Sequence, residues 1–100
     1  MSESTASTRY AIAATSRPSI GHGFRLQWEP AQQAHVLLYP EGMVKLNLTA
    51  GEILKRCDGT RTVHEIVADL ETAFGATNLA NDVTSFMTFA LGKHWLEIRK

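Results

Sequence analysis

The side chains in this chain best suited to metal binding or nucleophilic chemistry are four histidines and one cysteine. The histidines are His22, His35, His64 and His94. None of them is spaced from another histidine or from Cys57 as in an HxxxH or CxxC motif. Arg56 precedes Cys57 and could lower the thiol pKa, yet a free cysteine at a helix end is more commonly a small packing residue. The spacing therefore favours neither a metal site nor a catalytic nucleophile.

Two further classes of catalytic motif are absent from the sequence. Gly42, Gly51 and Gly59 stand alone, so there is no glycine-rich phosphate loop, and no GxSxG nucleophile elbow is present. We therefore expect a protein that is not an enzyme and that holds no cofactor of its own.

Composition limits the partners that the chain can attract. The 100 residues suffice for one domain, and ten basic residues balance ten acidic ones. A neutral chain lacks the long-range attraction that nucleic acid or an anionic membrane exerts on basic proteins, so we expect neither partner. A single cysteine suits a reducing cytoplasm, and no apolar run approaches the roughly 20 residues of a membrane-spanning helix.

Residues 1–23 differ in composition from the rest of the chain. They are rich in serine and threonine and are interrupted by Pro18, Gly21 and Gly23. Such a segment buries too little apolar surface to offset its ordering entropy. We predict a flexible N-terminal tail over residues 1–23 and one folded domain over residues 24–100.

Three segments in the first half of that domain are predicted to be strands. Residues 24–29 alternate apolar and polar side chains, which places Phe24, Leu26 and Trp28 on an inward face. Residues 34–39 and 43–48 flank Pro40-Glu41-Gly42, whose turn chemistry indicates a hairpin.

Three helices are predicted to follow the hairpin. Thr49 with Glu52, and Thr62 with Glu65, have the spacing of capping boxes. The first helix buries Ile53, Leu54 and Cys57 and stops at Asp58-Gly59. The second carries an apolar stripe that runs from Val63 to Phe74 and ends at Gly75. The third begins near Asn78 or Asn81. Its apolar stripe comprises Val83, Phe86, Met87, Ala90, Leu91 and His94. Residues 95–98 form a last helical turn or a short strand.

This order of elements predicts a winged-helix-like α+β domain, in which a three-stranded antiparallel sheet is followed by a three-helix bundle. Helix-turn-helix proteins place their second helix in a DNA groove, so a DNA-binding regulator is the alternative function. However, the second helix here carries Glu65, Asp69 and Glu71, and phosphate contacts require lysine or arginine. We therefore regard DNA binding as the weaker hypothesis.

The outgoing strand of the hairpin is the best candidate for a binding surface. A helix follows it at once, so its far edge can stay unpaired and accept an extended peptide as an additional strand. The apolar arc of the third helix widens at Phe89, about 60° beyond Phe86, and could form the wall of a peptide groove. The helix residues also fit plain core packing, above all Val83 and Phe86. The same open edge could pair two copies, so a monomer and an edge-strand or swapped homodimer are both open.

Several short blocks of this chain resemble the PqqD family, the pyrroloquinoline quinone biosynthesis protein D. They are Trp28-Glu29-Pro30, residues 35–42, residues 45–54, Cys57-Asp58-Gly59, Thr62-Val63 and Ile66-Val67. They occur in the family's order, and the resemblance covers most of residues 24–98.

The resemblance implies a non-catalytic peptide chaperone. Members of the family bind the leader of the precursor peptide PqqA and deliver it to PqqE, a radical SAM enzyme that supplies its own iron–sulfur cluster. In the wider family the leader pairs with the third strand and lies against the third helix. Carried onto this chain, the implied contacts are Met43, Val44, Lys45, Leu46, Asn47 and Leu48, together with Val83, Phe86, Met87, Phe89 and Ala90.

Overall fold

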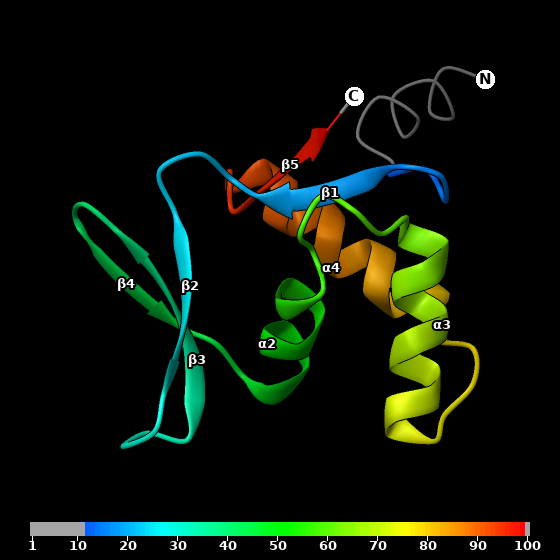
Figure 1. Ribbon diagram of the computed structural model, residues 1–100, viewed down its shortest axis with the longest axis horizontal. Helices are drawn as coiled ribbons and strands as arrows, with labels where there is room; N and C mark the ends of the chain where they lie inside the picture. The colour runs from blue at the N-terminus through cyan, green and yellow to red at the C-terminus, as the bar shows by residue number, and fades with distance from the viewer. Residues whose placement is uncertain (1–11, 100) are drawn as a thin grey trace.

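The computed structural model describes residues 12–99, which form two small sheets and three helices (Figure 1). In chain order the elements are β1 (Arg17–Ile20), β2 (Arg25–Glu29), β3 (Ala34–Tyr39), β4 (Gly42–Lys45), α2 (Leu48–Lys55), α3 (Val63–Phe74), α4 (Ala80–Gly92) and β5 (Leu96–Arg99). Figure 1 shows the β2–β3–β4 sheet on one side of the molecule and α3 on the other, with α2 between them. The predicted α+β architecture of a three-stranded antiparallel sheet and three helices is confirmed.

The larger sheet packs on α2 through the face that carries Leu37. Leu26, Leu37 and Val44 oppose one another across the three strands, and Leu37 is fully buried. Trp28 lies on the same face as Leu26, as predicted, but its side chain is 50% exposed rather than buried. Trp28 lies on the outer strand β2, where it packs edge-on against His35 with ring centroids 5.0 Å apart. The helix covers the central strand, and it is His35 that contacts Gly51 of α2.

Strand β1 departs from the predicted N-terminal tail. Arg17–Ile20 pairs antiparallel with β5, and Pro18 and Ser19 are buried. The N–H of Gly59 donates to the carbonyl oxygen of Pro18 at 2.9 Å. The partners of this strand come from positions about 40 and 80 residues away, so local composition gave no sign of it. The part of the predicted tail in residues 1–11 lies outside the described residues.

The segment before β1 also supports the start of α3. The carbonyl oxygens of Ala14 and Ser16 accept from the N–H groups of His64 and Val63, at 3.0 and 2.9 Å. Thr62 accepts from the Glu65 N–H, and the Glu65 carboxylate accepts from the Thr62 N–H, which confirms the second predicted capping box. In every α-helix the first four backbone N–H groups have no acceptor within the helix. Here the N-terminal segment and the cap satisfy those donors.

The caps of the other two helices differ from the predictions. Asn47, not Thr49, caps α2: its side-chain oxygen accepts from the Ala50 N–H at 2.8 Å. Neither Asn78 nor Asn81 caps α4, which begins after Leu79 without a side-chain cap. The Leu79 N–H instead donates to a Glu71 carboxylate oxygen at 3.0 Å. A glutamate eight residues earlier thus provides the acceptor for the backbone N–H of the residue that precedes α4.

The ends of α3 and α4 follow the sequence in part. Gly75 closes α3 in the left-handed conformation with φ 61°, as predicted. The helix α4 stops at Gly92, so His94 is not part of its buried stripe; it is exposed with φ 67°. The chain turns there into β5, and of the two alternatives for residues 95–98 the short strand is the one observed.

The hydrophobic core lies between the three helices, β3 and β5. Ile53 and Leu54 of α2, Ile66 and Leu70 of α3, and Met87 of α4 are almost fully buried within it. Of the helices within residues 12–99, none combines the length and the apolar character needed to cross a lipid bilayer.

Replacing Thr62 with alanine should lower the free energy of unfolding by about 1 kcal/mol, because the capping box loses its hydroxyl acceptor. Chemical denaturation with urea measures this difference. Thr72→Ala is the matched control, since Thr72 is exposed within the same helix and alanine is the better helix former. Equal stability of the two variants would contradict the role of the cap.

Arg56 ties α2 to α3 by a charge-assisted network. Its guanidinium donates to a Glu52 carboxylate oxygen at 2.7 Å, to the Glu52 carbonyl oxygen at 2.9 Å and to an Asp69 carboxylate oxygen. The hydrogen bond from Arg56 holds the pKa of Glu52, and that of Asp69, below its ordinary value. The folded state therefore favours both ionised carboxylates.

Folding lowers the pKa values of Glu52 and Asp69, so their ionised carboxylates stabilise the folded state fully at a pH above the ordinary carboxyl pKa. This stabilisation is lost as the pH falls through the pKa values of the folded state. Arg56→Met should lower the free energy of unfolding by about 1–2 kcal/mol at pH 7. The difference from wild type should shrink below about pH 4. Lys55→Met is the control, since Lys55 lies 3.8 Å from Glu52 but is exposed. Urea denaturation across this pH range tests the expectation, and a pH-independent difference would refute it.

Candidate functional site

The edge of β4 that faces away from β3 carries unpaired backbone groups. The N–H of Leu46 donates to the carbonyl oxygen of His35 at 3.0 Å, so Leu46 and His35 are a hydrogen-bonded pair. In an antiparallel ladder such pairs recur at every second residue, which makes Val44–Leu37 and Gly42–Tyr39 the next hydrogen-bonded pairs. Val44 and Gly42 therefore direct their backbone groups toward β3, whereas Met43 and Lys45 direct theirs outward. Across residues 12–99, no strand pairs with that outer edge.

The strand is shorter than the sequence predicts. It ends at Lys45 rather than at residue 48. The Leu46 N–H still donates to His35 of β3, but Asn47 is already committed to capping α2. Leu48 begins the helix and is 72% exposed. Of the six predicted contact residues, Met43, Val44 and Lys45 thus belong to β4, Leu46 and Asn47 form the connection, and Leu48 is the first residue of α2.

The five predicted contact residues of α4 divide into two groups. Val83, Met87 and Ala90 are buried in the core, and of these three Val83 also lines the wall of a pocket. Phe86 is half-buried and Phe89 is 50% exposed. The two phenylalanines are the members of this set with substantial exposed surface, and the assignment of a peptide contact to any of the five residues stays a prediction.

Trp95 extends the aromatic surface of α4. Its ring meets Phe89 edge-on at a centroid distance of 5.5 Å and lies 6.4 Å from Phe86. The ammonium of Lys93 lies 5.6 Å from the Phe89 ring centroid, a cation–π distance. The sequence analysis assigned Trp95 no role in binding, because its proximity to Phe86 and Phe89 arises from the turn that follows the helix.

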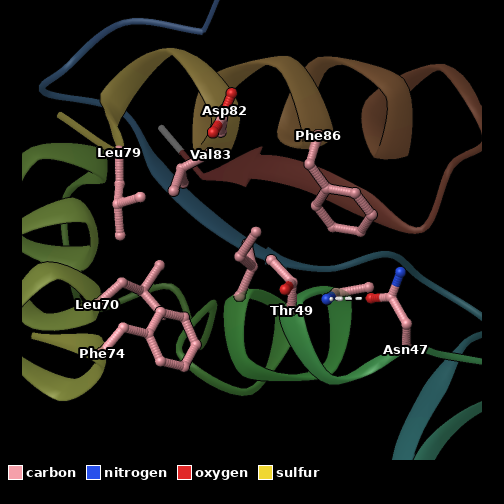
Figure 2. Close-up of a pocket in the computed structure, with 10 residues that line it drawn as sticks. Asn47, Thr49, Leu70, Phe74, Leu79, Asp82, Val83 and Phe86 are labelled. Carbon is pink, nitrogen blue, oxygen red and sulfur yellow. Dashed lines mark hydrogen bonds between the residues drawn. The ribbon is translucent and has the colours of Figure 1, made fainter. Parts of the chain in front are cut away.

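A pocket of about 280 Å³ lies between the starts of α2 and α4 and the end of α3. Figure 2 shows the rings of Phe74 and Phe86 directed into it from opposite sides, with Leu79 and Val83 reaching in from the α4 side. The remaining lining residues are Asn47, Thr49, Ala50, Ile53, Leu70 and Asp82. Asn47 is the last residue of the connection from β4, so the pocket begins two residues beyond the end of that strand.

Sequence reasoning missed this pocket. Phe74 belongs to the predicted apolar stripe of the second helix, yet its side chain is 41% exposed at the last turn of α3. The lining comes from three helices that are separated in the chain by loops of different length. No local pattern relates residues 47, 74 and 86, so only the packed structure reveals their common cavity.

The residues considered for chemistry lie apart from one another. Cys57 is buried, its thiol donates to the Ile53 carbonyl oxygen at 3.2 Å, and burial raises the thiol pKa to about 12. A thiol with that pKa is protonated at neutral pH and is a poor nucleophile. Within the described part of the chain, no three histidine, cysteine or carboxylate residues are grouped as metal ligands would be.

Comparison with known proteins identifies a family. Residues 34–96 match the family model of coenzyme PQQ synthesis protein D (PqqD). A PqqA binding protein of Stutzerimonas stutzeri is 51% identical over 89 residues, which cover 88% of this chain and 97% of that protein. A PqqA binding protein of Azotobacter vinelandii is 49% identical over 82 residues, covering 81% and 89%.

A solved structure has the same fold. It is the solution NMR structure of the PqqD part of Methylobacterium extorquens PqqCD, described as a functional, stand-alone recognition element for ribosomally synthesized, post-translationally modified peptides. It aligns with a TM-score of 0.72 and 29% identity, covering 88% of this chain and 96% of that one. With an open sheet edge, an adjoining pocket and these relatives at about half identity over most of its length, this chain belongs to the PqqD family.

Proposed function

We propose that this chain binds the precursor peptide PqqA as an additional strand on the outer edge of β4, and does so without catalysing a reaction. The observation that carries the proposal is the row of outward backbone groups at Met43 and Lys45. An extended peptide satisfies such groups by main-chain hydrogen bonds, while neighbouring side-chain contacts supply selectivity. The relatives named PqqA binding proteins support the choice of peptide.

The aromatic surface of α4 is the second part of the proposed site. Phe86 and Phe89 are accessible, and Phe86 lines the pocket that Asn47 also borders, so the accessible face of α4 and the end of β4 share a boundary. Aromatic side chains contribute strongly to binding because they bury much apolar area with few rotatable bonds. We therefore expect a peptide on β4 to contact these rings.

We further propose that the bound peptide is presented to the radical SAM enzyme PqqE, in the cytoplasm. The family's role in coenzyme PQQ synthesis supports a handover, since a protein that only binds a precursor must pass it to an enzyme. The buried reduced thiol of Cys57 is compatible with a reducing compartment. The family match gives the DNA-binding alternative no support.

The Lys45→Pro variant should weaken PqqA binding at least tenfold, because proline removes an outward N–H donor. Proline is tolerated on an edge strand where its nitrogen faces solvent, so the fold should survive. Titration calorimetry with the PqqA peptide measures the affinity, and amide spectra check the fold. Lys45→Ala keeps the N–H and should bind within about threefold of wild type. A folded Lys45→Pro protein with unchanged affinity would sink the strand-addition mechanism.

The same edge also permits pairing between two copies, so dimerisation should compete with the peptide. Light scattering at increasing protein concentration, with and without PqqA, tests this. Any dimer should convert to complexes of one chain with one peptide as PqqA is added. A dimer that binds peptide and stays intact contradicts competition for β4.

A further inference from the structure

Within residues 12–99, the three-stranded sheet meets the helices mainly where α2 crosses β3. The extensive contacts between this sheet and the helices are those of α2 with β3, and Figure 1 shows α2 between the sheet and α3. The helix α4 is joined to α2 through the core, in which Met87 of α4 and Ile53 of α2 are almost fully buried. The spacing between β4 and the aromatic surface of α4 therefore depends on how closely α2 approaches β3.

Gly51 of α2 lies against His35 of β3 at this crossing. A Cβ atom at position 51 would lie 2.8 Å from Nδ1 of His35, 3.1 Å from its Cβ and 3.3 Å from its Cγ. Non-bonded carbon atoms prefer separations of about 3.5–4.0 Å, so the two elements approach this closely because glycine lacks a side chain. Glycine is a poor helix former, and the approach to β3, rather than helix stability, accounts for it inside α2.

The surroundings of His35 prevent it from moving aside for a side chain at position 51. Its carbonyl oxygen accepts from the Leu46 N–H at 3.0 Å, and its ring packs edge-on against Trp28 with a centroid distance of 5.0 Å. Rotation about χ1 of His35 would displace Nδ1 and Cγ but not Cβ, whose position is fixed by the backbone of the strand. A larger residue at position 51 must therefore shift α2 relative to the sheet.

We infer that Gly51 and His35 are a positioning pair, which sets the separation between β4 and α4 that the bound peptide requires. The inference rests on the proposed function and assigns a role to two residues outside the proposed contacts, one in α2 and one in β3. A peptide that pairs with β4 and touches Phe86 and Phe89 needs both surfaces at a fixed spacing. Binding groups act together when they are held within about 0.5 Å of the productive geometry, so a small shift of α2 matters.

A series of side chains of increasing size at position 51 tests this inference. Gly51→Ala should weaken PqqA binding about threefold or more, and Gly51→Val about tenfold or more, because each added carbon displaces α2 further from β3. Titration calorimetry with the PqqA peptide measures the affinities, and urea denaturation checks that each variant is folded. Alanine favours a helix more than glycine does, so a less stable α2 would not explain weaker binding by Gly51→Ala.

Substitutions of His35 supply the compensating change. His35→Ala removes two of the three atoms that a Cβ at position 51 would meet, and His35→Gly removes all three. In a double-mutant cycle, the loss of affinity caused by Gly51→Ala should shrink in the His35→Ala background and disappear in the His35→Gly background. The cycle cancels whatever the His35 substitutions do by themselves to the strand.

Gly92→Ala is the matched control. Gly92 is the last residue of α4, and a Cβ there would meet no atom within 4 Å. It makes the same chemical change on the helix that carries the aromatic surface, so the affinity for PqqA should stay within about twofold of wild type.

The outcomes separate this inference from the proposed function. If wild type binds PqqA and Lys45→Pro weakens it, but folded Gly51→Ala and Gly51→Val bind like wild type, the positioning pair is refuted and strand addition stands. Weaker binding that His35→Gly does not restore also refutes the pair, since the effect then does not pass through His35. Gly51→Ala alone decides the question if valine prevents folding. Wild-type protein that fails to bind PqqA overturns the proposed function and the positioning pair with it.

Discussion

The cap that Asn47 places on α2 fixes where the sheet stops and where the helices begin. Leu46 makes the last backbone bond to β3, and one residue later the Asn47 side chain accepts the N–H of Ala50. The chain therefore changes from strand to helix within two residues. Because α2 leaves across the central strand, nothing in the described chain continues alongside β4, and the outer edge of that strand stays open.

The same junction places the pocket next to the edge. Asn47 and Thr49 form part of the pocket rim because they start the helix that closes one wall. The other walls come from α3 and α4, whose buried residues hold them in place within the core. Burial also explains why α4 serves two purposes: Met87 and Ala90 support the core, whereas Phe86 and Phe89 remain accessible on the adjacent surface.

The second sheet joins the two ends of the described chain. Strand β1 pairs with β5, and the residues before β1 satisfy donors at the start of α3. An early segment of the chain is thereby connected both to its last strand and to the middle helix. In a domain of this size, which has a high ratio of surface to volume, such long-range pairing supplements a small core.

The sequence by itself determined the features that depend on residues close together in the chain. The hairpin around residues 40–42, the Thr62 capping box and the glycine at the end of α3 each involve neighbours within about five positions, and all are present in the structure. The family blocks likewise identified the PqqD family, since such blocks are local in the chain.

Only the tertiary structure decided what depends on distant partners. It showed that Arg17–Ile20 is a strand, that Trp28 is exposed, and that the Leu79 N–H donates to Glu71. It also brought residues 47, 74 and 86 to one cavity. Pairing across the chain and the covering of one element by another depend on how the helices and sheets pack, and no local spacing of residue types records that arrangement.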